Sequence, residues 1–306
     1  LYKVDTSSGS VHFIRRQVED IAVPASGIVL IDEASMLNET VWCDVFNVCQ
    51  YFNLCIILVG DPFQLPPVKD TFSVFSSTFP HDEKVTLTEI LRQAAESNII
   101  RASMKIRGGD VGGGLSELQL IQHQNLIKSS IMALENSGVV ICHTNALRFR
   151  MNKDIRASMG RDPNEIEELE PILVLKNSYD VGLMNGETFS FSGWATPPKL
   201  ERFDADLLNV GTSKVNDIEV AMAREEIMGT TQLSMTDVRR TCSRRRDLTL
   251  NANLGYVLTC HKAQGSQYRV AFVVIENSIK PSTEEGRRWL YTAVTRATDV
   301  VAYTFA

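Results

Sequence analysis

Acidic and amide side chains follow two short apolar runs in the first quarter of the chain. Asp32 and Glu33 come directly after the run IVLI, and Asp61 and Gln64 come shortly after the run IILV. Uninterrupted branched apolar runs of this length are typical of strands buried on both faces of a parallel sheet. Because ligands bind parallel sheets at the carboxyl ends of the strands, we expect these four side chains to share one ligand-binding edge.

This set of residue types suits hydrolysis of a nucleoside triphosphate. That reaction needs a metal ion to neutralise phosphate charge, a carboxylate to orient or deprotonate water, and cations for the charge that develops at the γ-phosphate. Asp32 is placed to hold Mg²⁺, and the adjacent Glu33 points differently and could act on the water. Taken alone the pattern is weak, since acids at a strand end can simply cap the next helix. Likewise, the prolines and glycine of the turn 60–68 are consistent with a purely rigid turn.

The elements that would position these residues alternate between strand and helix. Between the two apolar runs, Asn38 is a candidate helix cap, and apolar residues recur at helical spacing up to Cys49. This pattern predicts a βαβ unit with a right-handed crossover. Residues 85–88 are a candidate third strand, and residues 97–107 a helix that ends in the glycine-rich stretch 108–114, which we expect to be flexible.

The alternation restarts near residue 137, where we place a domain boundary. The run VVIC leads into a helix with Leu147, Met151 and Ile155 on one face. Residues 188–254 break the rhythm with short apolar runs, prolines and an arginine cluster, and they predict a small, mainly β insertion. Further strands are expected at 172–175, 256–258, 270–275 and 300–303, and a helix at 289–296.

Size and composition predict a soluble globular protein of about two domains, with 306 residues of which 44% are hydrophobic. No apolar stretch reaches the roughly 18 residues that span a bilayer, and no apolar leader opens the chain, so we expect a cytoplasmic protein without membrane contact. The six cysteines form no CxxC pair, which favours reduced thiols. The net charge of −6 limits any nucleic-acid contact to a local track.

Six ordered motifs carry a resemblance to the superfamily 1 helicases. They occur in the order of motifs II to VI of that family and look most like its RecD/Dda-like branch, which moves 5′ to 3′: IVLIDEASM, ILVGDPFQLPPV, LTEILRQ, VICHTN, LTCHKAQGSQ and LYTAVTRA. The match spans nearly the whole chain. It implies an ATP-dependent DNA helicase or translocase that uses ATP and Mg²⁺. The implied partners are single-stranded DNA, junctions of single-stranded and duplex DNA, and other replication or recombination proteins, in a bacterial or phage-infected cell.

The resemblance also implies an α/β fold of two RecA-like parallel-sheet domains, the first incomplete, with a small barrel of the Src-homology-3 type (SH3-like) inserted in the second. Asn177 and the turn 183–187 resemble the family's entry into that barrel. His12 or Phe13 is a candidate wedge of a strand-splitting pin, although an ordinary hairpin fits equally well. The expected bounds are 1–26 for the pin-like hairpin region, 27–136 for the C-terminal part of the first RecA-like domain, 137–187 and 255–306 for the second, and 188–254 for the β insertion.

Roles in hydrolysis can be carried over position by position. The residue matching Asp32 binds magnesium in the family, that matching Glu33 activates water, and that matching Gln64 senses the γ-phosphate. Arg92 of LTEILRQ and Arg296 of LYTAVTRA match two arginines that reach the γ-phosphate from opposite sides. A guanidinium fork complements phosphate oxygens, and removal of such a finger costs roughly 10³ to 10⁵ in rate.

Two further residues are expected at the nucleotide and five along the DNA. Asp61 shares the sheet edge, and Gly265 of HKAQGSQ lacks a side chain, so its backbone could approach a phosphate closely. The family positions that line the path of single-stranded DNA match Pro66, Thr144, Asn145, Thr259 and His261. Such groups would contact phosphates and sugars without reading sequence. Outside the motif context each would more often be a helix cap or a satisfied polar group. The arginine cluster 239–246 is consistent with DNA contact or with a solvated loop.

The chain departs from the family in one respect, because no GxxxxGK(S/T) loop occurs in it. The family places that loop upstream of the point where this chain begins, at Leu1 without a methionine. We therefore expect a fragment that is inactive alone, cut from an intact helicase. The alternatives are a non-hydrolysing nucleic-acid-binding or scaffold subunit, which the retained catalytic set disfavours, and a motor subunit of a nuclease complex.

Overall fold

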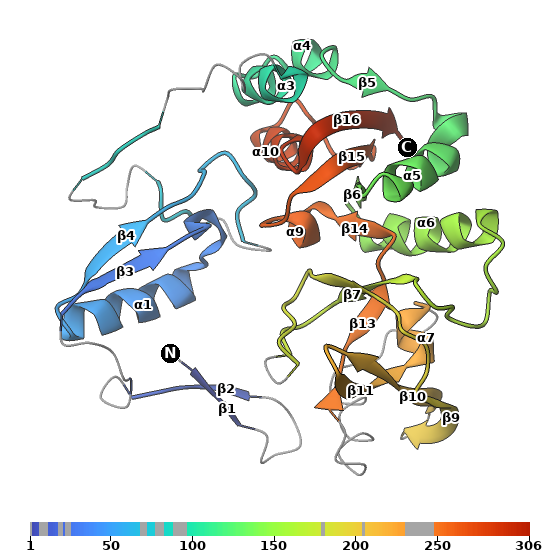
Figure 1. The fold of residues 1–306 in the computed structure, drawn as a ribbon. Helices are drawn as coiled ribbons and strands as arrows, with labels where there is room; N and C mark the ends of the chain where they lie inside the picture. The colour runs from blue at the N-terminus through green and yellow to red at the C-terminus, as the bar shows by residue number, and fades with distance from the viewer. Residues whose placement is uncertain are drawn as a thin grey trace. The chain divides into compact units, whose positions relative to one another are not determined.

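The computed structural model describes residues 2–5, 12–17, 21, 26–67, 72–76, 83–87, 97–178, 181–203, 206–229 and 248–306. The chain divides into two compact units. Figure 1 colours the chain by residue number, from blue at the N-terminus to red at the C-terminus. The first unit comprises Leu1–Gln119 and Ser278–Arg296, and the second comprises Leu120–Asn277 and Ala297–Ala306. A helix from near the end of the sequence therefore belongs to the first unit.

A βαβ unit forms the centre of the first unit. Strand β3 (Ile28–Ile31) pairs in parallel with β4 (Cys55–Leu58), and η2 (Ala34–Met36) and α1 (Glu39–Tyr51) connect them. The side chain of Asn38 caps α1 by accepting a hydrogen bond from the Val41 amide at 2.8 Å. The predicted strand, cap, helix and strand are all confirmed.

The two strands are half-buried on one face and exposed on the other, so the expectation of burial on both faces is wrong for the described residues. Ile28 and Leu30 are 66% and 62% exposed. The sheet has two strands in the part of the chain that the structure describes, and its alternate residues face opposite sides. The half-buried face packs in a small apolar cluster of Ile31, Ala34, Trp42, Ile56, Leu58, Val74 and Phe75.

Residues 85–88 do not form the third strand that the sequence predicted, as far as they are described. Residues 83–87 have no regular secondary structure, and Val85 and Leu87 are 84% and 93% exposed. Their apolar and β-branched side chains favour a strand, but a strand needs a neighbour to satisfy its backbone groups. Local preference was therefore overridden by the absence of pairing at this position.

Helices α3 (Asn98–Arg107), α4 (Val111–Leu115) and α10 (Glu284–Val294) complete the first unit. Residues 111–114 of the glycine-rich stretch 108–114, which was expected to be flexible, are helical instead, and Asp110 caps α4 by accepting from the Gly113 amide at 2.9 Å. A Cβ on Gly114 would lie 2.6 Å from the Ile106 side chain, so the glycine permits close packing of α4 against α3. Composition suggested mobility, but close helix packing decided the structure.

The N-terminal hairpin is confirmed. Strand β1 (Tyr2–Asp5) pairs antiparallel with β2 (His12–Arg15), with Val4 opposite Phe13. Its role as a strand-splitting pin stays a prediction.

A mainly parallel sheet lies at the centre of the second unit, in the order β14-β6-β15-β16-β5, with its first four strands parallel. The bounds are β5 (Gln119–Leu120), β6 (Val139–Cys142), β14 (Val257–Thr259), β15 (Tyr268–Ile275) and β16 (Ala297–Phe305). Short helix η3 (His123–Asn125) and helices α5 (Leu126–Glu135), α6 (Asn145–Ser158) and α9 (Cys260–Ala263) accompany it. The predicted apolar face of α6, with Leu147, Met151 and Ile155, is buried.

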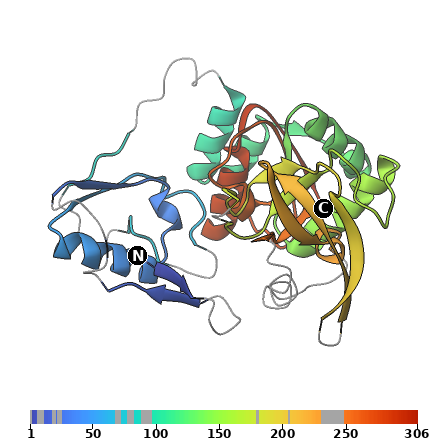
Figure 2. The ribbon, with the colours of Figure 1, turned by 60° about the horizontal axis from the view of Figure 1, so that its bottom comes forward.

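Two further sheets account for the region in which the sequence predicted a β insertion. A three-stranded antiparallel sheet has the order β13-β7-β8, and a four-stranded sheet has the order β12-β11-β10-β9. Figure 2 shows β9 and β10 as a long curved ribbon. The bounds are β7 (Pro171–Val174), β8 (Thr188–Ser190), β9 (Thr196–Phe203), β10 (Asp206–Val215), β11 (Ile218–Ala223), α7 (Arg224–Ile227), β12 (Leu248–Thr249) and β13 (Ala252–Leu254). The arginine cluster lies outside the described residues.

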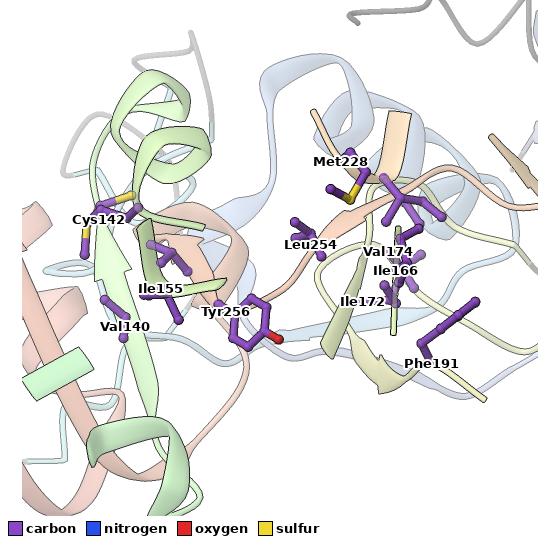
Figure 3. Close-up of a cluster of buried hydrophobic side chains, with 14 of the residues drawn as sticks. Val140, Cys142, Ile155, Ile166, Ile172, Val174, Phe191, Met228, Leu254 and Tyr256 are labelled. Carbon is purple, nitrogen blue, oxygen red and sulfur yellow. The ribbon is translucent and has the colours of Figure 1, made fainter. Parts of the chain in front are cut away.

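One apolar cluster spans these sheets of the second unit. Val140 and Ile155 lie on the side of the parallel sheet, Ile172 and Phe191 lie on the side of the antiparallel sheet, and Tyr256 lies between them (Figure 3). In the part of the chain that is described, no helix has the length and apolar character needed to cross a membrane.

A charged pair is sealed inside this unit. Arg156 and Glu170 are 3% and 0% exposed, and their side chains make two hydrogen bonds, of 2.6 and 2.9 Å. Burial would raise the pKa of Glu170, but hydrogen bonds from Arg156, the Glu167 amide and the Tyr256 hydroxyl outweigh it and hold that pKa below its ordinary value. The pair is therefore charged at neutral pH.

Glu170→Gln leaves the Arg156 charge buried and unpaired, so we expect the free energy of unfolding at neutral pH to fall by about 3 kcal/mol or more. Because the folded pKa of Glu170 is lowered, its contribution is present above the unfolded value of roughly 4.3 and is lost as pH falls through the folded value. Urea unfolding at pH 7 and at lower pH measures both. Asp299→Asn, which breaks an exposed pair with Arg269, is the matched control and should lower the free energy of unfolding far less than Glu170→Gln does, because water screens an exposed pair. Equal losses in the two variants would contradict the prediction.

Candidate functional site

The carboxyl ends of β3 and β4 bring the predicted acids to one edge of the sheet. The Val59 amide donates to the Ile31 carbonyl at 2.8 Å, and the Ala34 amide donates to the Val59 carbonyl at 2.9 Å. These bonds hold the turn that carries residues 32–33 beside the turn that leads into residues 61–64. The structure therefore brings together the two turns that the sequence placed at one edge.

Glu33 has an unusual backbone and an unsatisfied carboxylate. Its φ and ψ are 51° and 38°, in the left-handed region that non-glycine residues seldom adopt. Its Oε2 atom is buried, and no group of the described residues bonds to it. The adjacent Asp32 is exposed, and its Oδ1 accepts from the Glu33 amide at 2.8 Å. A buried oxygen without a partner is costly unless water or a ligand bonds to it.

These two carboxylates fit a magnesium ion that is bound mainly by a nucleotide. Among the described residues, no three His, Cys, Asp or Glu side chains are grouped as a metal site. Mg²⁺ is usually held by one or two carboxylates together with phosphate oxygens and water. Asp32, whose Oδ2 accepts from no group among the described residues, provides such a carboxylate, and the Oε2 of Glu33, unpartnered among those residues, suits a bond to water.

Hydrogen bonds that join Asp61 and Leu65 to Tyr291 and Thr292 of α10 fix the loop that follows β4, and these four residues are called the clasp. Asp61 Oδ2 accepts from the Tyr291 hydroxyl at 2.5 Å, and Asp61 Oδ1 accepts from the Phe63 amide at 2.9 Å. The Leu65 amide donates to Thr292 Oγ1 at 3.0 Å. Burial and the bond to Asp61 raise the pKa of Tyr291 above its ordinary value, so the hydroxyl remains a donor. In this structure the Asp61 carboxylate therefore orders the loop, and its contact with a nucleotide stays a prediction.

The remaining predicted catalytic residues lie on or near this clasp, with one exception. Gln64 is half-buried, and its backbone amide donates to the Asp61 carbonyl at 3.1 Å. Arg296 is buried just beyond the end of α10, where its Nε donates to the Thr292 carbonyl at 3.0 Å. Arg92 lies outside the described residues. A continuous series of contacts thus links residues 32–33 to the loop that follows β4 and to α10, just beyond which Arg296 lies.

Thr144 is a helix cap in the second unit. Its Oγ1 accepts from the Leu147 amide at 3.2 Å and donates to Glu276 Oε2 at 2.7 Å. The other oxygen of Glu276 accepts from the amides of His143 and Thr144, at 2.7 and 2.8 Å. Sequence reasoning missed Glu276, whose only local signal is its place directly after β15. Contact of Thr144 with DNA stays a prediction.

Thr259 and Asn145 come to the same edge of the parallel sheet. Strands β6 and β14 are neighbours, with Cys142 opposite Thr259, so both following turns start at one level. Thr259 is buried and directly precedes α9, and Asn145 is exposed at the start of α6. His261 is half-buried within α9.

Gly265 and Pro66 complete the predicted set. Gly265 is exposed with a φ of 80°, and a Cβ there would meet nothing within 4 Å. Its backbone is therefore open to approach by a ligand. Pro66 is half-buried and belongs to the first unit, in the loop that follows β4.

Two cations beside this edge were missed, the buried Arg148 and the half-buried Lys262. Arg148 is 4% exposed, and its Nη2 donates to Asn253 Oδ1 at 2.7 Å, but its buried Nη1 bonds to no described residue. Lys262 Nζ donates to the Leu175 carbonyl at 3.3 Å and to Asn185. Burial, together with the nearby Arg148, lowers the pKa of Lys262 to about 8. Lys262 lies in the motif HKAQGSQ, whereas Arg148 has no local signal.

Comparison with known proteins finds family models for two parts of the chain. A family model described as the UvrD-like helicase C-terminal domain matches residues 254–302, and one described as an AAA domain matches residues 3–130. The ATP-dependent RecD2 DNA helicase of Deinococcus radiodurans is 23% identical, over 89% of this chain and 35% of that protein. The chain therefore spans about a third of that relative's length. Uncharacterized protein R530 of Acanthamoeba polyphaga mimivirus is 21% identical, over 91% of this chain and 74% of that protein.

Solved structures share the fold. The Pif1 helicase from Bacteroides in complex with ADP-AlF3 and single-stranded DNA superposes with a TM-score of 0.54 at 17% identity, over 90% of this chain and 70% of that one. The Pif1 helicase from Candida albicans gives 0.53 at 16% identity, over 90% and 71%. The UvrD-like helicase match, the AAA match and the RecD2 relative make the chain similar to superfamily 1 helicases of the RecD type, and the Pif1 structures share its mixed α/β fold.

Proposed function

We propose that the protein couples ATP hydrolysis to movement along single-stranded DNA and to separation of duplexes. The observation that carries this proposal is the edge at which the turn 32–33 meets the loop 61–64, with a buried carboxylate oxygen of Glu33 left unbonded among the described residues. The relatives support it, since RecD2 is an ATP-dependent DNA helicase and the Bacteroides Pif1 structure holds ADP-AlF3 and single-stranded DNA.

Each residue predicted to act in ATP binding and hydrolysis has a distinct task in this proposal. Asp32 holds Mg²⁺, which when bound with ATP supplies positive charge against the phosphates. Glu33 orients the attacking water and accepts its proton at the carboxylate. Gln64 bonds to the γ-phosphate, and Arg296 and Arg92 offer guanidinium groups to the charge that develops there. Asp61 acts through the loop that it orders, and Gly265 lets the backbone approach a phosphate.

The DNA path runs along the second unit in this proposal. Thr144, Asn145, Thr259 and His261, with Pro66 from the first unit, contact phosphates and sugars. Arg148 and Lys262 add local positive charge, which is needed because the chain as a whole carries −6. No carboxylate of the described residues pairs with either cation.

Finer features of the family are part of the same proposal. The bounds 27–136 and 137–187 with 255–306 would define the two RecA-like domains, 188–254 an SH3-like barrel, and 1–26 a pin that acts at junctions of single-stranded and duplex DNA. The mainly β character of the described part of 188–254 and the hairpin β1–β2 support these assignments. Contacts with other replication or recombination proteins, and a bacterial or phage-infected cytoplasm, complete it.

Glu33→Gln removes the proposed proton acceptor while keeping the side-chain shape, so we expect DNA-stimulated ATP hydrolysis to fall by roughly 10² to 10⁴ with ATP binding retained. The assay is done on the protein translated from the whole reading frame. Glu39→Gln, at an exposed acid in the first turn of α1, is the control and should keep its activity. Hydrolysis that survives Glu33→Gln would refute the assignment. DNA binding without any hydrolysis in the unaltered protein would instead indicate a non-hydrolysing subunit.

Affinity for single-stranded DNA should fall as pH rises from 7 to 9. The pKa of Lys262 is lowered to about 8, so its ammonium is charged below that pH and neutral above it. Fluorescence anisotropy of a labelled oligothymidylate at several pH values measures the effect. Lys262→Met should weaken binding at pH 7 and flatten the profile, whereas Lys153→Met, at an exposed lysine on α6, should keep its slope. An unchanged pH profile in Lys262→Met, with an unchanged circular dichroism spectrum, would exclude Lys262 from the DNA path.

A further inference from the structure

A second concave site lies in the first unit, apart from the turn that carries Asp32 and Glu33. It is a pocket of about 140 Å³ between α3, α10 and the loop after β4, and α3 and α10 are neighbours in Figure 1. Its lining residues are Phe63, Arg107, Glu284, Arg287, Arg288 and Tyr291. None of the residues proposed to bind magnesium or water lines it.

Positive charge predominates in this pocket. Three guanidinium groups face one carboxylate, and that carboxylate, of Glu284, pairs with Arg288 at 2.8 Å. Arg287 donates to the Ser282 carbonyl at 3.0 Å, and neither Arg287 nor Arg107 has a carboxylate partner in the described part of the chain. Both are half-buried. Partly desolvated cations without a counter-charge favour the binding of an anion.

The Phe63 ring orients the guanidinium group of Arg107. The guanidinium carbon of Arg107 lies 3.8 Å from the centre of the Phe63 ring. Stacking uses the flat face of a guanidinium and leaves its N–H groups directed outward along the edges. The Tyr291 hydroxyl is engaged with Asp61, and Arg287 uses Nη1 for the Ser282 carbonyl, so the pocket keeps the N–H groups of Arg107 and the remaining N–H groups of Arg287 as donors without a carboxylate partner among the described residues.

We propose that this pocket binds a phosphate group through Arg107 on α3 and Arg287 on α10. Two guanidinium forks from different elements match the several oxygens of a phosphate, which accepts paired N–H bonds in fixed geometry. The phosphate belongs either to a nucleic-acid strand or to a free nucleotide. The site stands independently of ATP hydrolysis, because it shares no residue with the proposed catalytic set.

A ligand in the pocket would also affect the candidate catalytic edge formed by the turns after β3 and β4. Phe63 and Tyr291 line the pocket, and the amide of the first and the hydroxyl of the second both bond to Asp61. A ligand held against these two residues would therefore restrain the loop 61–65. Phosphate binding in the pocket would therefore affect the candidate catalytic edge through the Asp61 carboxylate.

The test compares Arg107→Gln and Arg287→Gln with Arg101→Gln. Arg101 is on the same helix as Arg107 but pairs with Glu117 outside the pocket, so the control removes one positive charge elsewhere. Labelled oligothymidylate is titrated by anisotropy at several salt concentrations, and ADP and inorganic phosphate by calorimetry. Each pocket variant should weaken one of these ligands about tenfold, and for the oligonucleotide the slope of log affinity against log salt should fall by about one.

The pattern of loss identifies the source of the phosphate. Loss confined to the oligonucleotide assigns it to a strand, and loss confined to ADP and inorganic phosphate assigns it to a free nucleotide. Arg107→Lys keeps the charge without the planar fork, so it should fold normally and recover only part of the affinity. Pocket variants that bind all three ligands as Arg101→Gln does would overturn the proposal. This outcome is separate from the ATPase test, which depends on Glu33.

Discussion

The first unit depends on hydrogen bonds that join a helix near the end of the chain to a loop near its start. Tyr291 donates to Asp61 and the Leu65 amide donates to Thr292, across more than 220 positions of sequence. Together with the backbone bonds between the turns after β3 and β4, they give the predicted catalytic edge a fixed framework. The raised pKa of Tyr291 keeps its hydroxyl protonated and donating. A ligand that contacts Tyr291 or Thr292 of α10 would therefore also influence the position of the loop 61–65.

The second unit uses buried charge in two opposite ways. Arg156 and Glu170 satisfy each other within the interior, and Tyr256 adds a further bond, so this group stabilises the fold. Arg148 and Lys262, by contrast, have amide and carbonyl partners but no carboxylate among the described residues. Burial without a counter-charge is costly, which explains the lowered pKa of Lys262. Such a site is suited to an anionic ligand rather than to stability.

Local pattern was most informative where strand and helix follow from a single stretch of sequence. The cap at Asn38, the strands flanking α1 and the buried face of α6 were all predictable, because side-chain period and capping chemistry act over a few residues. The glycine-rich α4 was not, because its stability comes from close packing of Gly114 against α3. The exposed residues 83–87 show the same limit, since apolar residues form a strand only beside a partner.

The sequence by itself determined the chemistry that is available: carboxylates at strand ends, an amide and arginines, in ordered motifs that resemble those of superfamily 1 helicases. Only the tertiary structure decided which groups are free to act. Asp61 turned out to be bonded at both oxygens, Thr144 to be held by Glu276, and Glu33 to keep one buried oxygen unpartnered among the described residues. These outcomes depend on contacts between distant positions, and distant contacts leave no periodic or local signal in a single sequence.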